Sequence, residues 1–151
     1  MNTIIVYCSM TGNTEQMAEL IAAELTRLGD CVEVKDGIDA YADELIAYDR
    51  ILIGSYTWGD GELPDEMLGF YEELQDTDLT GKIGAVFGAG DSSYDYFARA
   101  VDVLEETLKN RGCEIITNGL KVDKEFEEQV TTKCRTFCEN ITNAQVKVKT
   151  A

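Results

Sequence analysis

The segment Ser9–Thr14 limits what this chain can be more than any other stretch of its sequence. It reads Ser-Met-Thr-Gly-Asn-Thr, and it joins an apolar run, Ile4–Cys8, to a pattern of apolar residues at helical spacing. A loop in this position gathers backbone N–H groups at the positive end of a helix dipole, where an anion is favoured, and Gly12 permits close approach. The segment therefore predicts a phosphate-binding loop. The alternative is an ordinary turn in which Asn13 or Thr14 caps the helix and nothing binds.

The composition of this loop restricts the kind of phosphate it can hold. No lysine or arginine precedes Arg27, so an anion bound here is held by neutral dipoles. The loop lacks the Gly-Lys-Ser/Thr ending of the P-loop and the three spaced glycines of the dinucleotide fingerprint. A single terminal phosphate remains the best fit.

Apolar runs alternate with helical patterns along the chain, and this alternation predicts the fold. We expect an α/β protein with a doubly wound, five-stranded parallel sheet and helices on both faces. We expect one domain, 1–151, with residues 142–151 as a flexible tail. The predicted strands are Ile4–Cys8, Cys31–Lys35, Ile51–Ser55, Ile83–Gly88 and Ile115–Thr117, the last continuing toward Val122.

The charge balance narrows the classes of partner. The chain has 13 basic and 29 acidic residues, a net charge of −16, and no histidine. Such a surface repels nucleic acid and anionic membranes and attracts partners with basic patches. Without histidine, hydrolase and zinc chemistry are disfavoured, and we expect no metal. The N-terminus carries no signal-peptide pattern, so a cytoplasmic location is expected.

Five cysteines occur without a C-x-x-C pair. We interpret all of them as reduced core thiols. Cys134 and Cys138 lie four residues apart on an expected helix face, which would suit a metal pair, but no further ligand spacing supports one.

Two further loops follow predicted strands and carry aromatic residues among glycines. They are Tyr56–Leu63, which contains Trp58, and Ala89–Phe97. In a doubly wound sheet, ligands bind at the carboxyl ends of the strands, so both loops would meet the phosphate-binding loop there. Aromatic side chains from both would stack on a planar ring. The alternative is that the aromatic residues of the second loop only pack the start of the next helix.

Three motifs carry a family resemblance: Ser-x-Thr-Gly-Asn-Thr at 9–14, Thr-Trp-Gly-Asp at 57–60, and Gly-Asp-Ser-Ser-Tyr-x-Tyr-Phe at 90–97. In order and spacing they resemble the bacterial flavodoxins, with a similarity to the short-chain subgroup over almost the whole chain. The resemblance implies strand order 2-1-3-4-5, non-covalently bound flavin mononucleotide (FMN) at the switch point in that order, and electron transfer without catalytic residues.

The resemblance also assigns residues to the cofactor. It places the phosphate on the first loop: Ser9, Met10, Thr11, Gly12, Asn13 and Thr14. It places Trp58 and Tyr94 on the two ring faces, and it implies that the peptide between Gly59 and Asp60 rotates on reduction so that its carbonyl accepts from ring N5. Tyr56 stands where some relatives have a small hydroxyl residue near the phosphate. The other predicted contacts are Thr57, Gly61, Ala89, Gly90, Asp91, Tyr96, Phe97 and Ala98.

The charges of these loops favour low-potential chemistry. Residues 51–81 and 83–98 contain acids and no lysine or arginine, which opposes an anionic reduced flavin. We therefore expect a one-electron carrier that cycles between semiquinone and hydroquinone. By resemblance and charge, its partners would be basic-faced redox proteins such as flavodoxin reductases, and low-potential acceptors. A monomer is the default expectation.

Three other classes of protein share parts of this alternating strand and helix pattern. An FMN-dependent quinone or azo reductase would need room and basic residues for a nicotinamide nucleotide beside the ring. A response-regulator receiver needs an acidic cluster after its first strand, where this chain has hydroxyls. A small tyrosine phosphatase would use Cys8, but the arginine it needs six residues later is Thr14 here.

Overall fold

The computed structural model describes residues 1–9, 12–58, 61–90, 98–123 and 127–150, with the side chains of residues 127 and 144–150 left out. The strands are β1 (Asn2–Cys8), β2 (Cys31–Asp36), β3 (Arg50–Ser55), β4 (Ile83–Ala89), β5 (Glu114–Ile115) and β6 (Leu120–Val122). The helices are α1 (Asn13–Arg27), the 3-10 helix η1 (Ala42–Ala47), α2 (Asp65–Leu74), α3 (Arg99–Asn110) and α4 (Glu127–Thr150).

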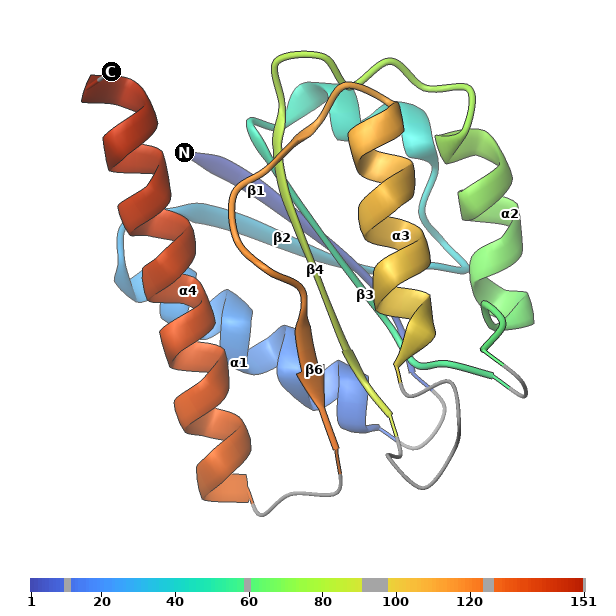
Figure 1. The fold of residues 1–151 in the computed structure, drawn as a ribbon, viewed down its shortest axis with the longest axis horizontal. Coiled ribbons are helices and arrows are strands. Elements are labelled where there is room, and N and C mark those ends of the chain that lie inside the picture. The colour runs from blue at the N-terminus through green and yellow to red at the C-terminus, as the bar shows by residue number, and fades with distance from the viewer. Residues whose placement is uncertain (10–11, 59–60, 91–97, 124–126, 151) are drawn as a thin grey trace.

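The strands form one parallel sheet in the order β2-β1-β3-β4-β5, with β6 also paired to β4 (Figure 1). This confirms the predicted fold class and strand order. The register sets Cys8 of β1 opposite Ser55 of β3, and Gly54 opposite Phe87 of β4. Because all pairs are parallel, the carboxyl ends of β1, β3 and β4 lie at one edge of the sheet.

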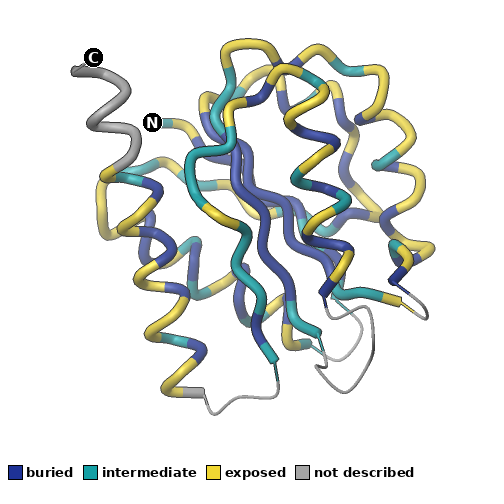
Figure 2. The backbone as a smooth tube through the Cα atoms, viewed as in Figure 1, coloured by how far each residue is buried: buried dark blue, intermediate teal, exposed yellow. Residues whose placement is uncertain are grey.

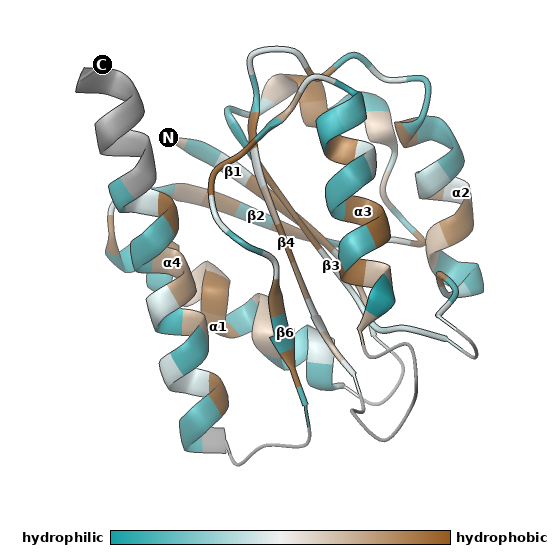
Figure 3. Ribbon diagram, viewed as in Figure 1, coloured by the Kyte–Doolittle hydropathy of each residue, from teal (hydrophilic) through white to brown (hydrophobic). Residues whose placement is uncertain are grey.

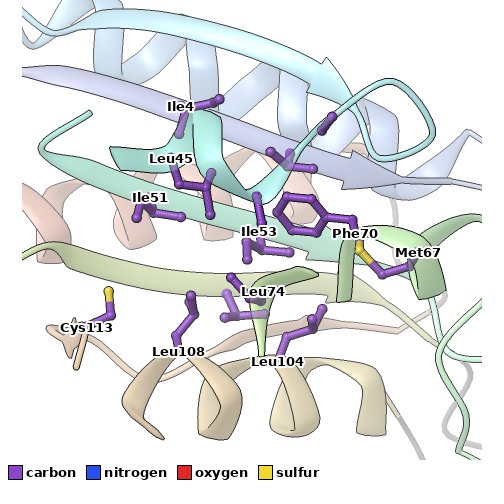
Figure 4. Packing of buried hydrophobic residues seen from close by; sticks show 14 of the residues in the cluster. Ile4, Leu45, Ile51, Ile53, Met67, Phe70, Leu74, Leu104, Leu108 and Cys113 are labelled. Carbon is purple, nitrogen blue, oxygen red and sulfur yellow. The ribbon is translucent and has the colours of Figure 1, made fainter. Parts of the chain in front are cut away.

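Helices cover both faces of the sheet, and each face has its own apolar core. Helices α1 and α4 lie on one face, and α2, α3 and η1 on the other (Figure 1). The side chains of β3 alternate accordingly: Ile51 and Ile53 belong to the core under α2 and α3, and Leu52 to the core under α1 and α4. Figure 4 shows the first of these cores, with side chains from both helices converging on β3.

The central strands are buried on both faces, as their unbroken apolar runs predict. Every residue of β3 is buried (Figure 2). Hydrophobic colour runs along the central strands, whereas the helices alternate between hydrophilic and hydrophobic colour (Figure 3). Helix α1 ends before Gly29 and α3 before Gly112, and both glycines have positive φ angles, 103° and 91°. Both helices therefore end next to a glycine in the left-handed backbone region.

The fifth strand of the predicted sheet occurs in two pieces. The expected strand Ile115–Thr117 ends at Ile115, and pairing with β4 resumes only at Leu120. Between the pieces, the N–H of Gly119 donates to the Glu105 carboxylate of α3 at 3.1 Å instead of to a strand. A Cβ at Gly119 would lie 2.5 Å from a methyl carbon of Val101, so a larger residue would not fit against α3 here.

The cysteines are all free, and one of them corrects the expectation of core thiols. Cys8, Cys113, Cys134 and Cys138 are buried, but Cys31 is exposed. Cys31 begins β2, the edge strand, and lies opposite Asn2 of β1 in the register. Cys31 is therefore exposed because it lies on an edge strand and not in the core.

Helix α4 continues through Thr150, so the expected tail, residues 142–151, begins within a helix. Its flexibility stays a prediction, as does the single-domain boundary. Among the helices described, none combines the length and apolar character needed to span a bilayer.

Candidate functional site: a helix N-terminus and two loops at the carboxyl edge

The carboxyl edge of the sheet brings together the ends of β1, β3, β4 and β6 with the first turns of α1, α2 and α3 (lower part of Figure 1). Three of these strands lead into the three segments that the sequence singled out. The site is therefore built by parallel pairing, which aligns strand ends far apart in the sequence.

The first segment ends in an N-terminus suited to an anion. Gly12 is the N-cap of α1 with φ 93°, and it has no side chain to cap the helix. Its own N–H donates to Ser9 Oγ at 3.1 Å, and the first helical bond runs from the Gln16 N–H to the Gly12 carbonyl at 2.9 Å. The N–H groups of the first turn thus lie at the positive end of the dipole without intrahelical acceptors.

Thr14 links this helix to the third segment. Its side chain is 1% exposed, and its Oγ1 accepts a long hydrogen bond, 3.4 Å, from the N–H of Ala89 at the end of β4. Asn13, by contrast, is exposed. Among the side chains predicted to hold a phosphate, Asn13 therefore faces solvent, whereas Thr14 joins two elements beneath the surface.

The loop after β3 is tied to α2 through Tyr56. The Tyr56 hydroxyl donates to Glu66 Oε2 at 3.0 Å, and the ring packs against the core under α2 and α3. Burial, with the neighbouring Glu66 carboxylate, raises the pKa of Tyr56 to about 12, so the phenol stays a donor at physiological pH. A bulky phenol anchored to α2 therefore begins the loop after β3.

The next two residues of the loop have different roles. Thr57 Oγ1 accepts a hydrogen bond from the N–H of Ala100 in α3 at 3.0 Å. Trp58 pairs with Glu62 through two backbone hydrogen bonds of 2.8 Å, and its side chain is 50% exposed. Gly61, at φ 95°, supplies the positive φ within this turn. The turn presents a large indole at the carboxyl edge instead of burying it.

The segment after β4 is fixed at both ends. The N–H of Gly90 donates to the carbonyl of Val122 at 2.8 Å. Ala98 is buried and occupies the N-cap position of α3 with φ 51°, the one positive φ among the described residues other than glycine. The remaining predicted contacts lie outside the described residues: Met10, Thr11, Gly59, Asp60, Asp91, Tyr94, Tyr96 and Phe97.

Two functional partners were not foreseen from the sequence. Glu66 in the first turn of α2 holds Tyr56, and the backbone of Ala100 holds Thr57. Neither contact follows from residue spacing, because one spans the turn between β3 and α2 and the other joins residues 43 positions apart. The one clue for Glu66 is its place two residues after Pro64, where acids favour a helix start.

The donor set fits a phosphorylated planar ligand. The α1 N-terminus offers neutral dipoles for a phosphate, and Trp58 offers an aromatic face at the same edge. Of the basic residues near this edge, Lys121 on β6 is engaged by Asp102 at 2.8 Å. Such a set can bind and orient a ligand of this kind.

Comparison with known proteins identifies the ligand. Residues 5–137 match the family model described as flavodoxin. The chain is 40% identical to probable flavodoxin 2 of Bacillus subtilis, covering 89% of this chain and 92% of the relative. Among solved structures, oxidised flavodoxin 1 from Bacillus cereus has a TM-score of 0.91 and 41% identity, covering 95% of this chain and 98% of its own. A short-chain flavodoxin has a TM-score of 0.90 and 32% identity, covering 95% and 97%. The chain therefore belongs to the flavodoxin family, whose members bind FMN and transfer electrons.

Proposed function

We propose that this chain is a low-potential, one-electron carrier that uses FMN between its semiquinone and hydroquinone states. The observation that carries this proposal is the carboxyl edge of the sheet, where an uncapped helix N-terminus and an exposed indole lie together. FMN supplies the redox chemistry there, and the chain supplies binding, orientation and electrostatics.

Different residues at the carboxyl edge would bind the phosphate, cover the ring and anchor the loop after β3. The first turn of α1 and Ser9 would hold the phosphate, since their donors are neutral and need no lysine. Trp58 would cover one ring face, and Tyr94 the other. The Tyr56–Glu66 bond anchors the loop that carries Trp58 to α2. Anchoring reduces the entropy lost when a ligand binds.

Acidic residues support the assignment of low potential. Residues 51–81 hold no lysine or arginine, and Glu62, Asp65 and Glu66 surround the described part of the loop after β3. Negative charge near the ring opposes a further negative charge on it, so the second electron enters only from a strong reductant.

The same charge supports the proposal for partners. A chain with a net charge of −16 would dock on basic-faced redox proteins, such as flavodoxin reductases and low-potential acceptors. We propose that it acts as a cytoplasmic monomer rather than as an FMN-dependent reductase, because residues 51–81 and 83–98 hold no lysine or arginine that could bind the phosphates of a nicotinamide nucleotide.

Stepwise anaerobic reduction, followed by absorption spectroscopy, tests the proposed function. A blue neutral semiquinone that accumulates at half reduction is expected. Flavin bands that bleach directly would favour the two-electron reductase, and a chain that takes up no FMN would overturn the site.

The variant Trp58→Ala tests the ring-covering role. Loss of a stacked aromatic should weaken FMN binding by about 1–3 kcal/mol and shift the potentials. The matched control is Ile46→Ala, which removes a side chain of similar exposure, 54%, from η1, away from the carboxyl edge. Equal affinities for both variants would mean that Trp58 is only surface structure.

A further inference from the structure

Helix α3 begins without a cap of its own. Its N-cap residue, Ala98, has no side-chain donor or acceptor and lies in the left-handed region at φ 51° and ψ 32°. Ala100 is the second residue of α3, so its N–H has no acceptor inside the helix. A serine, threonine or aspartate at the N-cap would normally supply that acceptor.

The missing acceptor comes from the loop after β3. Thr57 Oγ1 accepts from the Ala100 N–H at 3.0 Å, across 43 positions of sequence, in a partly buried setting. A hydroxyl in this position does what an N-cap side chain does, but from another segment of the chain. It thereby ties the loop that carries Trp58 to the helix that follows the segment 91–97.

We propose that Thr57 is a positioning residue: it caps α3 from a distance and so holds the loops after β3 and β4 in register. This inference rests on the proposed function, because those two loops would carry the aromatic faces for FMN. It assigns to Thr57 a role different from direct phosphate contact. Tyr56 anchors the same loop to α2, so consecutive residues tie it to two helices.

The role predicts how binding changes when the hydroxyl is removed. Without the cap, a smaller fraction of the molecules holds the loop after β3 in the conformation that binds FMN. The apparent affinity for FMN falls in proportion to that fraction. Thr57→Val should weaken FMN binding about five- to tenfold, the equilibrium effect of losing one helix cap. Thr57→Ser keeps the oxygen and should restore the affinity to within about twofold of the original.

A phosphate-free ligand separates capping from phosphate contact. If Thr57 positions the loops, Thr57→Val weakens riboflavin and FMN binding by the same factor, since the disturbed region faces the ring. If Thr57 instead holds the phosphate, FMN binding falls while riboflavin binding does not, and the proposal is overturned.

The matched control is Thr107→Val on the same helix. Thr107 is 8% exposed, and its hydroxyl donates to the Val103 carbonyl at 2.8 Å within α3. The substitution is the same and also removes one hydrogen bond, but it leaves the cap intact. A loss of flavin affinity equal to that of Thr57→Val would show that general destabilisation of α3 explains both.

Amide hydrogen exchange provides a readout that needs no bound flavin. On the full chain, with and without FMN, Thr57→Val should speed exchange at Ala100 at least about fivefold, while Thr57→Ser and Thr107→Val leave it unchanged. Unchanged exchange at Ala100 in Thr57→Val would overturn the cap. If the original chain bound no FMN, the proposed function would fail, and this exchange comparison would still decide whether Thr57 caps α3.

Discussion

A buried ion pair lies at the amino ends of the strands, opposite the candidate site. The guanidinium of Arg50 is 2% exposed and bonds to Asp30, whose side chain is 9% exposed. Thr3 donates to the same carboxylate at 2.9 Å. Burial lowers the pKa of Arg50, and Asp30 opposes that shift. The pair thus compensates a charge that the core would otherwise reject.

Replacing Asp30 should show how far the stability of the fold depends on the Arg50–Asp30 ion pair. Asp30→Asn keeps the shape but leaves the Arg50 charge uncompensated, and we expect the free energy of unfolding to fall by about 3–5 kcal/mol. Asp49→Asn is the control, because Asp49 is exposed next to Arg50 and its loss should cost less than about 1 kcal/mol. Urea denaturation of both variants measures the difference. Similar losses in the two would mean that Arg50 does not depend on Asp30.

The buried thiols predict the response to alkaline pH. Burial raises the pKa of Cys8, Cys113, Cys134 and Cys138 to about 12 each. Unfolded thiols lose their protons near pH 8.5, so between about pH 9 and 12 the folded state binds more protons than the unfolded state. Stability is therefore present below pH 8.5 and lost as pH rises, by up to about 1.4 kcal/mol per pH unit for each thiol.

Denaturation at successive pH values checks this slope. Cys138→Ala should make it shallower above pH 9, whatever the variant costs at pH 7. The matched control, Cys31→Ser, removes a surface thiol and should leave the slope as it is. A free energy of unfolding that stays constant up to pH 11 would contradict the prediction.

At the residue scale, the sequence predicted which segments meet at the carboxyl edge of the sheet but not the hydrogen bonds between them. Ser9, Gly12 and Trp58 could be predicted because loop position, glycine and an aromatic residue in a polar segment each have a local physical meaning. The bonds from Tyr56 to Glu66 and from Thr57 to Ala100 could not, since they depend on how the loop after β3 is oriented against two helices. Thr14, assigned to the phosphate by resemblance, is buried at the junction with β4.

At the element scale, β3 and β4 meet with little space beside the site. A Cβ on Gly88 would lie 2.1 Å from the backbone oxygen of Ser55 and 2.9 Å from a methyl carbon of Val101. Backbone cannot give way as a flexible side chain does. The two strands can therefore approach at this point only because residue 88 is glycine.

Two glycine-to-alanine variants test this in opposite directions. Gly88→Ala should destabilise the protein by about 1–3 kcal/mol, because the added methyl overlaps backbone. Gly69→Ala, in the exposed face of α2 where nothing lies within 4 Å, should stabilise by about 0.5–1 kcal/mol. Thermal melts of both variants measure the shifts. Equal changes in the two would mean that contact at Gly88 does not limit the strand spacing.

Most helices and strands could be predicted from the sequence, and the two exceptions have physical reasons. Unbroken apolar runs such as Ile51–Ser55 mark buried parallel strands, and glycines at Gly29 and Gly112 mark helix ends, because both signals are local. The fifth strand divides because Gly119 bonds to Glu105 on α3 instead of to β4. Cys31 is exposed because β2 is an edge strand, which its sequence does not reveal.

At the scale of the whole molecule, the dominant feature is net charge. The chain carries 29 acids against 13 basic residues, and the described ion pairs engage only some of them. The excess negative charges therefore repel one another on the surface. Such repulsion favours expanded states and, in the folded state, attraction to basic partners.

Screening should relieve this repulsion. Raising NaCl from about 0.01 M to 0.3 M shortens the Debye length severalfold and should stabilise the fold by about 1 kcal/mol, a rise of about 2–4 °C in the melting temperature. The rise should be steepest at low salt and level off. The same salt should slow association with a basic-faced partner, because steering depends on unscreened charge.

Charge reversal distinguishes screening from a general effect of salt. Glu72 on α2 and Glu106 on α3 are exposed and absent from the described ion pairs of the two helices. Replacing both with lysine lowers the net negative charge, so the double variant should melt higher at low salt and gain less from added NaCl. A salt response as large as that of the original chain would mean that NaCl acts through solvation of apolar surface. The acidic surface would then attract basic partners without destabilising the fold.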